Sequence, residues 1–553
     1  MRQDTFDYVI VGAGSAGCVL ADRLTESGEH SVLLLEYGGS DRSIYIQMPA
    51  ALSIPMNMPR YNWFFHTEPE PGLGGRSLHT PRGKVLGGSS SINGLVYVRG
   101  NPLDFERWAA EGASGWAYRD VLPYFKRTER RDSGGDTYRG GCGKIATRYG
   151  PLGNPLHKVW LEAGRQAGYP VTQDMNGFRQ EGFGRMDMTV GNGRRSSAAN
   201  AYLRPAMRRR NLLVRTHSLA TRVLFEGRRA VGVAYRRGND GSVARARREV
   251  ILSAGPIQSP KLLKLSGVGP AQELAQHGIG VIQDRPGVGE NLQDHLEFYL
   301  QMACTQPVTL YSQMSPFRKA LIGMRWLLTK DGLGASNHFE TGGFIRSGAG
   351  VRYPNVQYHF LPMVVNYDGS SSAQAHGFQA HVGPMRSRSK GWVRLASADP
   401  NEKPKVFFNY LSWPEDLEEM RACVRLTREI FAQPAFAPYR GREIQPGMTV
   451  QSDEQIDDFV RRHAESAYHP SCTCRMGSPQ DPLTVVDPQA RVIGLEGLRV
   501  VDSSIMPSIP TGNLNAPTLM LAEKAADHIR GKPGLPPEDA PFYLAPHWES
   551  AQR

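Results

Sequence analysis

The stretch Phe6-Asp7-Tyr8-Val9-Ile10-Val11-Gly12-Ala13-Gly14-Ser15-Ala16-Gly17 decides the fold. An apolar run of strand length leads directly into a G-x-G-x-x-G turn, and Val19, Leu20 and Leu24 follow at helical spacing. Residues 31–35 form a second short apolar run that leads to Glu36, 19 residues beyond Gly17. Strand, glycine turn, helix, strand and acid in this order predict a βαβ unit that binds a dinucleotide.

Each residue type in this unit has a physical reason. Gly12 allows the tight turn, Gly14 lets the backbone approach a pyrophosphate, and Gly17 permits close packing of the helix on the strand. The helix that begins near Ser15 directs its N-terminus at the phosphates, and Glu36 can accept hydrogen bonds from ribose hydroxyls. The motif does not distinguish NAD from FAD.

A second glycine-rich segment, residues 81–94, reads PRGKVLGGSSSING. Its small residues allow the backbone to approach a flat ring or a phosphate without interference from side chains. We expect this segment to contact the cofactor through Gly87, Gly88, Ser89, Asn93 and Gly94.

The composition is that of a large globular protein of one or a few domains. The 553 residues are 40% hydrophobic, and 65 basic against 53 acidic side chains give a net charge of +12. Extensive disorder, a collagen-like repeat and a disulfide scaffold are excluded, and six sparse cysteines favour a reduced, cytoplasmic setting. No apolar stretch reaches the roughly 18 residues that span a bilayer, and no zinc-ribbon spacing occurs. We expect no secretory signal, because residues 1–5 are followed directly by the first apolar strand.

Basic residues cluster at 208–210 and at 236–248. Such clusters can contact anionic lipid headgroups or nucleic acid, although solvated loops and strand ends are the commoner explanation. Because no nucleic-acid-binding motif accompanies them, we expect no nucleic-acid partner. A peripheral contact with the cytoplasmic face of the inner membrane is a further expectation.

Several segments together resemble one family. Residues 255–263, 266–269, 468–470 and 511–515, with the two glycine-rich segments, resemble the glucose–methanol–choline (GMC) flavoprotein oxidoreductases in order from about residue 6 to residue 531. The resemblance implies that the dinucleotide is FAD. It also implies an α/β fold (α+β overall) in which a Rossmann-like FAD-binding domain is interleaved with an antiparallel-sheet substrate-binding domain.

The expected domains are discontinuous. We assign residues 1–155, 195–297 and 464–531 to the FAD-binding domain, residues 156–194 and 298–463 to the substrate-binding domain, and residues 532–553 to a C-terminal tail. Short apolar runs at 357–361, 378–382 and 392–395, separated by Gly, Ser and Pro, predict strands of an antiparallel sheet.

The resemblance also implies the residues that act. Alcohol oxidation needs a base for the hydroxyl proton and an acceptor for the hydride, which flavin N5 can be. His469, which from sequence alone is more often a turn residue, matches the family's active-site histidine, and Asn513 matches its partner that donates to the developing alkoxide. Asp502, Asn515 and the backbone of Val223 match cofactor contacts. Ile92 replaces a histidine that bonds the flavin covalently in related oxidases, so we expect noncovalent FAD.

The segments 48–51, 61–63, 291–297 and 469–472 are most similar to bacterial choline-oxidising members. This implies oxidation of choline to betaine aldehyde, with continuation to glycine betaine through the aldehyde hydrate, and a respiratory quinone or carrier as acceptor. Glu297 matches the residue that holds the trimethylammonium group, and Tyr45, Trp63, Phe298 and Phe360 are candidate aromatic contacts.

Two alternatives remain open at this point. Pro316-Phe317 stands where those relatives tend to have paired tryptophans, which favours a neutral aromatic or long-chain alcohol. The same fold also hosts hydroxynitrile lyases, which keep FAD without turning it over.

Overall fold

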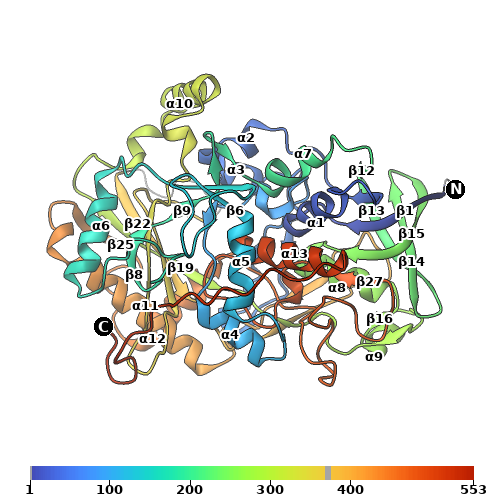
Figure 1. The fold of residues 1–553 in the computed structure, drawn as a ribbon. Coiled ribbons are helices and arrows are strands. Elements are labelled where there is room, and N and C mark those ends of the chain that lie inside the picture. The colour runs from blue at the N-terminus through green and yellow to red at the C-terminus, as the bar shows by residue number, and fades with distance from the viewer. Residues whose placement is uncertain (1–2, 368–374) are drawn as a thin grey trace.

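The computed structural model describes residues 3–367 and 375–553, and two sheets organise them (Figure 1). Within these residues the first sheet has seven strands in the order β12-β2-β1-β15-β14-β13, with β27 beside β15. The pairings among β12, β2, β1, β15 and β27 are parallel. The apolar residues of β2 and β27 are fully buried, as strands covered on both faces require, whereas Leu213 of the edge strand β12 is 40% exposed. The strands are β1 (Gln3–Val11), β2 (Val32–Leu35), β12 (Leu212–Arg215), β13 (Ser218–Glu226), β14 (Arg229–Arg237), β15 (Asp240–Leu252) and β27 (Leu498–Val500).

Helices from the first and last parts of the chain pack together beside this sheet. α1 (Ser15–Thr25) follows β1 and packs against α13 (Asn515–Ile529), which in turn packs against α5 (Tyr118–Thr128) (Figure 1). α13 is buried along almost its whole length, because both of its faces lie against other elements. The first and last thirds of the chain therefore share one hydrophobic core.

The second sheet is antiparallel, in the order β25-β19-β22-β21-β20-β8, with β26 beside β19. α6 (Pro155–Gln166) and α11 (Pro414–Ala432) cover it, and α12 (Asp453–His463) packs on α11. Trp160, Phe360 and Phe378 are among the aromatic rings of its core. The strands are β8 (Gly182–Arg185), β19 (Leu296–Cys304), β20 (Thr341–Ile345), β21 (Val356–Leu361), β22 (Gly377–Pro384), β25 (Arg440–Gln445) and β26 (Glu465–Ser466).

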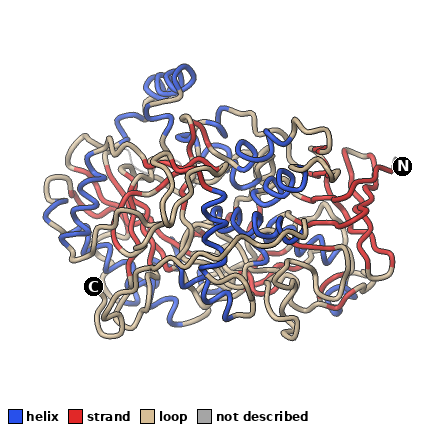
Figure 2. The backbone as a smooth tube through the Cα atoms, viewed as in Figure 1, coloured by secondary structure: helices blue, strands red, loops and turns tan. Residues whose placement is uncertain are grey.

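Shorter elements connect and flank the sheets (Figure 2). The helices are α2 (Ile44–Gln47), α3 (Ser53–Met56), α4 (Pro102–Ala110), α7 (Arg204–Ala206), α8 (Gly255–Leu265), α9 (Ala271–Gln276) and α10 (Pro316–Thr329). The strands are β3 (Phe65–His66), β4 (His79–Thr80), β5 (Val96–Tyr97), β6 (Glu129–Arg131), β7 (Ile145–Tyr149), β9 (Asp187–Met188), β10 (Val190–Gly191), β11 (Arg194–Arg195), β16 (Val268–Gly269), β17 (Gln283–Asp284), β18 (Glu290–Leu292), β23 (Gly391–Arg394) and β24 (Lys405–Phe407).

The expected fold class is confirmed: a parallel sheet with helices is interleaved with an antiparallel sheet. The strands expected at 357–361, 378–382 and 392–395 correspond to β21, β22 and β23. Residues 532–553 contain neither helix nor strand (Figure 2). The assigned domain limits remain an interpretation. β8, which lies within residues 156–194, pairs with β20 of the second sheet. Among the described residues, no helix is long and apolar enough to cross a membrane.

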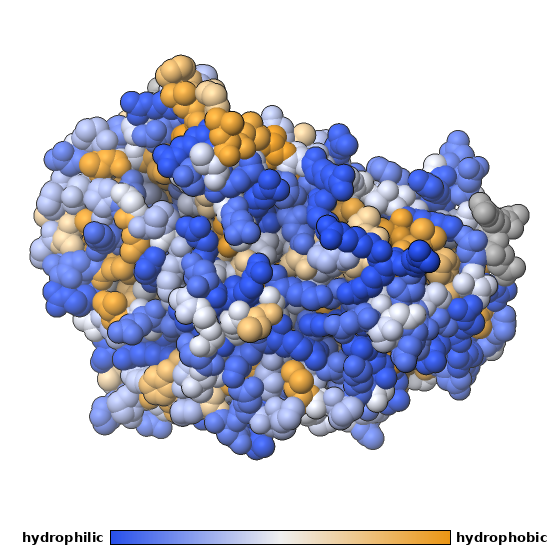
Figure 3. All heavy atoms as spheres, turned by 45° about the horizontal axis from the view of Figure 1, so that its top comes forward, coloured by the Kyte–Doolittle hydropathy of each residue, from blue (hydrophilic) through white to orange (hydrophobic). Residues whose placement is uncertain are grey.

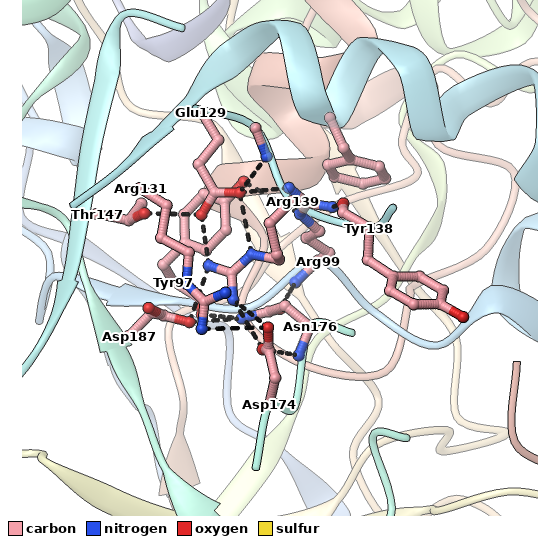
Figure 4. Close-up of polar contacts among 12 residues, drawn as sticks. Tyr97, Arg99, Glu129, Arg131, Tyr138, Arg139, Thr147, Asp174, Asn176 and Asp187 are labelled. Atoms are coloured by element: carbon pink, nitrogen blue, oxygen red, sulfur yellow. Dashed lines mark hydrogen bonds and ion pairs between the residues drawn. The ribbon is translucent and has the colours of Figure 1, made fainter. Parts of the chain in front are cut away.

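A buried ion network links β6 to β9 and to the residues after β5 (Figure 4). Arg139 Nε donates to Glu129 Oε2 at 3.0 Å, and its Nη2 lies 2.9 Å from Asp187 Oδ2. Arg99 is the second cation on Glu129. Burial opposes ionisation of Glu129, but Arg99 and Arg139 outweigh it and lower its pKa to about 2. The carboxylate is thus charged at neutral pH and fully enclosed.

Glu129→Gln should destabilise the protein by about 3–5 kcal/mol, because it leaves two buried guanidinium groups without their shared anion. Urea unfolding at pH 7 measures the loss. The wild-type advantage should shrink as the pH falls from about 4.5 toward about 2, where Glu129 itself becomes protonated. Asp458→Asn is the matched control, because its ion pair with Arg462 is exposed and worth less than about 1 kcal/mol. Equal losses in both variants would contradict the argument.

Candidate active site

One cavity is lined by residues of both sheets and brings together most of the predicted site residues. His469, Asn513 and Glu297 line it near the second sheet. The predicted cofactor residues that line it are Gly12, Gly14, Ser15, Glu36, Gly88, Ser89, Asn93, Gly94, Asp502 and Asn515. Gly17, Gly87 and Val223 are not among the residues that line it.

The glycine turn has the geometry that a dinucleotide requires. Gly12 has φ +101°, and a Cβ added there would lie 2.5 Å from Ser253 O. A Cβ on Gly17 would lie 1.9 Å from Gly12 O, so this glycine serves helix packing and not the ligand. A Cβ on Gly14 would meet only Ser253 O, at an ordinary contact distance of 3.7 Å, and Gly14 lines the cavity. Gly14 is therefore the position where a ligand can approach the backbone.

Glu36 is positioned at the end of β2, close to the turn. Its Oε2 accepts from Ala13 N at 2.9 Å and its Oε1 accepts from Gly38 N at 2.7 Å. Burial raises its pKa to about 7, although the two amides favour the charged form. Ser15 Oγ donates to Asn515 Oδ1 at 2.9 Å, so the N-termini of α1 and α13 meet at the cavity. Two positive helix ends facing one cavity suit an anionic ligand.

Among the remaining predicted cofactor residues, Gly88 lines the cavity, whereas Gly87 and Val223 do not. A Cβ on Gly88 would lie 2.7 Å from Gly14 Cα, so the two glycine-rich segments touch through these residues. Gly87, with φ +87°, packs instead against Ser91 and against Ala199, the first residue of the short π-helix that precedes α7. Val223 is buried, and its N donates to Ser266 Oγ at 2.8 Å.

Asp502 supports the wall of the cavity. Its Oδ2 accepts from Gly255 N at 2.9 Å and from Ser259 Oγ at 2.6 Å, and its Oδ1 accepts from Ser504 N at 2.8 Å. These bonds join the start of α8 to the end of β27, which explains a buried carboxylate here.

Hydrogen bonds fix the tautomer of His469. The carbonyl of Met385 lies 3.0 Å from His295 Nε2 and can only accept, so that nitrogen carries the hydrogen. The Nδ1 of neutral His295 then accepts from His469 Nδ1, 3.0 Å away. His469 Nε2 is therefore unprotonated, and it accepts a hydrogen bond from Asn513 Nδ2, 3.1 Å away. The nitrogen that could take a proton therefore faces the cavity.

Asn513 is oriented from the second sheet. Gln357 Nε2, on β21, donates to Asn513 Oδ1 at 3.0 Å. This contact turns the amide nitrogen of Asn513 toward His469. A hydrogen-bond donor and a proton acceptor thus stand side by side, as removal of a hydroxyl proton requires.

Burial keeps the imidazoles of this region neutral. It lowers the pKa of His469 well below its usual range, with His295 and His359 adding to the effect. The pKa of His295 falls to about 3 and that of His359 to about 4, mainly by burial. His469 is thus able to accept a proton across the neutral pH range.

Glu297 stands in β19 beside aromatic rings. Its Oε1 lies 3.5 Å from His381 Nδ1, and its backbone oxygen accepts from Tyr367 Oη at 3.0 Å. The ring centroids of Tyr299 and Tyr367 are 3.9 Å apart, and those of Tyr299 and His381 are 3.8 Å apart. Phe339 also lines this end of the cavity. A carboxylate among rings is a suitable environment for an organic cation.

The sequence-based choice of aromatic contacts is mostly wrong. Trp63 lines the cavity, but Phe298 and Phe360 lie in the core of the second sheet, and Tyr45 is 41% exposed outside the cavity. Phe317 is 72% exposed on α10. The missing tryptophan pair at Pro316-Phe317 therefore says nothing about the lining of the cavity.

Several site residues were missed in the sequence. Tyr299, Gln357, His359, His381 and Tyr367 line or support the cavity. Four of them occupy alternate positions of β19, β21 and β22, where polar or aromatic side chains alternate with core residues. That alternation is the signal that could have identified them.

Comparisons with known proteins agree with this geometry. Family models described as GMC oxidoreductase match residues 6–297 and 387–522. An oxygen-dependent choline dehydrogenase of Brucella suis biovar 1 is 58% identical over 547 residues, covering 99% of this chain and 100% of its own. One from Photobacterium profundum is 58% identical over 552 residues, covering 99% and 97%. The structure of a formate oxidase of Aspergillus oryzae, studied for FAD modification, has a TM-score of 0.89 at 26% identity, covering 96% of this chain and 98% of its own.

The residues present fit FAD. The open side of Gly14, the carboxylate of Glu36 and the two helix N-termini provide for a dinucleotide at one end of the cavity. Ile92, in the cavity wall, has no nucleophilic nitrogen, so we expect the flavin to be held noncovalently.

Gly14→Val should give a folded protein without flavin, because the added side chain enters the space that the pyrophosphate needs. The flavin absorbance per protein measures the effect, and acid denaturation of the wild type should release all flavin into solution. Gly153→Val is the matched control, since no atom lies within 4 Å of a Cβ added there. A flavin-loaded Gly14→Val protein, or flavin that stays with the denatured wild-type chain, would contradict this account.

Proposed function

The chain belongs to the GMC oxidoreductase family, and from this premise we propose that it oxidises choline to betaine aldehyde with FAD as cofactor. The observation that carries the proposal is the position of Glu297 and its aromatic neighbours beside the His469 and Asn513 pair in one cavity. Family membership supports alcohol oxidation, and the carboxylate supports a cationic alcohol.

FAD, when bound, supplies the acceptor for the hydride that leaves the alcohol carbon. His469 Nε2 accepts the hydroxyl proton, because its Nδ1 hydrogen is committed to His295. Asn513 donates through Nδ2 to the oxygen as negative charge develops there. The aldehyde hydrate presents a hydroxyl to the same pair, which allows a second oxidation to glycine betaine.

The substrate is held by local charge rather than by the charge of the whole protein. A net charge of +12 does not attract a cation from a distance, so a carboxylate inside the cavity is needed. Glu297 supplies it, while burial keeps His359 neutral and therefore without repulsion. A neutral primary alcohol is the alternative substrate, since the same base and donor would serve it.

The electron acceptor in this proposal is a respiratory quinone or carrier, reached through a peripheral contact with the membrane. The curated relatives are named oxygen-dependent, which makes dioxygen the alternative acceptor. The peroxide formed per alcohol oxidised in air distinguishes the two.

His469→Ala should retain FAD and slow flavin reduction by about 10²–10⁴-fold, the usual loss when a general base is removed. Anaerobic stopped-flow reduction with choline measures the rate. His547→Ala is the control, because this histidine is exposed in the C-terminal tail. Reduction at the wild-type rate would remove His469 from the mechanism.

Glu297→Gln should weaken choline oxidation by about 10–100-fold in kcat/KM and leave the neutral isostere 3,3-dimethylbutan-1-ol almost unchanged. The substitution keeps shape and removes charge. Both alcohols are measured with both proteins. Equal losses would make Glu297 structural, and a wild type that prefers the neutral alcohol would replace choline by the alternative substrate.

A further inference from the structure

α10 stands out from the body of the protein and exposes apolar side chains (Figures 1 and 3). Trp326 is its one buried residue. The exposed apolar side chains of the helix are Phe317 at 72%, Leu321 at 43%, Met324 at 51%, Leu327 at 55% and Leu328 at 79%. So many large exposed apolar side chains on one short helix mark an interaction surface.

The apolar side chains form a stripe that faces away from the protein. At 3.6 residues per turn, Phe317, Leu321, Met324 and Leu328 share one side of the helix, and Trp326 lies on the opposite side. Trp326 Nε1 donates to Gly193 O at 2.6 Å, which fixes the helix on the turn between β10 and β11. The orientation of the stripe is thus built into the fold.

The charges around the stripe are nearly all positive. Arg318, Lys319, Arg325 and Lys330 lie on or directly after the helix, against the single acid Asp331, which pairs with Arg325 at 2.8 Å. An apolar stripe flanked by cations is complementary to a bilayer that carries anionic lipid, and much less so to a second copy of a protein with net charge +12.

We infer that α10 is the element that docks this protein on an anionic lipid bilayer, with the stripe inserted among the acyl chains. The inference deepens the membrane contact proposed above by assigning it to one helix instead of the basic clusters at 208–210 and 236–248. It does not depend on which alcohol is oxidised.

Docking through α10 would bring the cavity close to the membrane. The turn Gly332–Ala335 that follows α10 packs against Pro49–Ala51, and the next residues, Leu52, Ser53 and Met56, line the cavity. An apolar acceptor dissolved in the bilayer would then have a short path to the cavity.

Flotation of the FAD-loaded protein with vesicles tests the inference. The wild type should float with vesicles of phosphatidylglycerol and phosphatidylcholine and much less with phosphatidylcholine alone. Phe317→Ser with Leu328→Ser should lower binding to anionic vesicles by at least about tenfold, because two large side chains no longer leave water. Leu483→Ser, at a residue 46% exposed on a different loop, is the matched control and should bind as the wild type does.

Two further measurements keep the outcome unambiguous. Flavin content and far-ultraviolet circular dichroism should be unchanged in the double variant, since both side chains are exposed. Hydrogen exchange of residues 316–329 should slow when anionic vesicles are added to the wild type. Equal flotation of the wild type and the double variant would overturn the inference. It would also be overturned if neither protein bound vesicles and the wild type formed a dimer that the double variant did not form.

Discussion

The active site depends on the antiparallel pairing of β26 with β19. The pairs Leu296↔Ser466 and Glu297↔Glu465 bring two distant parts of the chain together, so that Glu297 and His469 face one cavity. Asp294, just before β19, reinforces this junction: it accepts from His469 N at 2.6 Å, from Tyr410 Oη at 2.6 Å and from Ser466 Oγ. Burial raises its pKa to about 6, which these donors partly oppose. Ala467 N donates to His295 O at 2.8 Å and Ser471 N donates to Gln293 O at 3.0 Å, so the loop that carries His469 is held on both sides of this residue.

Burial lowers the pKa of three imidazoles at the catalytic end of the cavity. For the imidazoles it removes charge: the pKa of His295 falls to about 3 and that of His359 to about 4. For His469 the same effect leaves a neutral ring, and the hydrogen bond from Nδ1 to His295 makes Nε2 the unprotonated nitrogen. A cationic substrate therefore meets the carboxylate of Glu297 and the neutral ring of His359 at this end of the cavity. Burial thus serves catalysis, because it leaves His469 able to accept a proton, and it serves binding, because it leaves His359 uncharged.

The dinucleotide end could be predicted from sequence because its requirements are local. Gly12 and Gly14 contribute through backbone shape and Glu36 through its carboxylate, all within one βαβ unit, and their spacing is visible in the sequence. The aromatic contacts could not be predicted from the sequence, because they depend on which face of each strand turns toward the cavity. Phe298 and Phe360 are each one residue from a cavity residue, Glu297 and His359, and side chains one residue apart in a strand point to opposite faces. The exposed stripe of α10 was missed because apolar residues at helical spacing usually pack inward.

The same alternation separates specificity from stability. On β19, β21 and β22 one set of positions builds the aromatic core beneath α6 and α11, and the other set forms the cavity wall. Tyr299, His381 and His359 form one row across these strands, through the pairs Tyr299↔His381 and His359↔His381. A change in this row alters what the cavity accepts while the core that holds the sheet is left in place. The first sheet has less such freedom, because β2 and β27 are fully buried and its glycine turn has no side chain to vary where Gly14 lines the cavity. A fold divided in this way can keep its cofactor chemistry while its substrate changes.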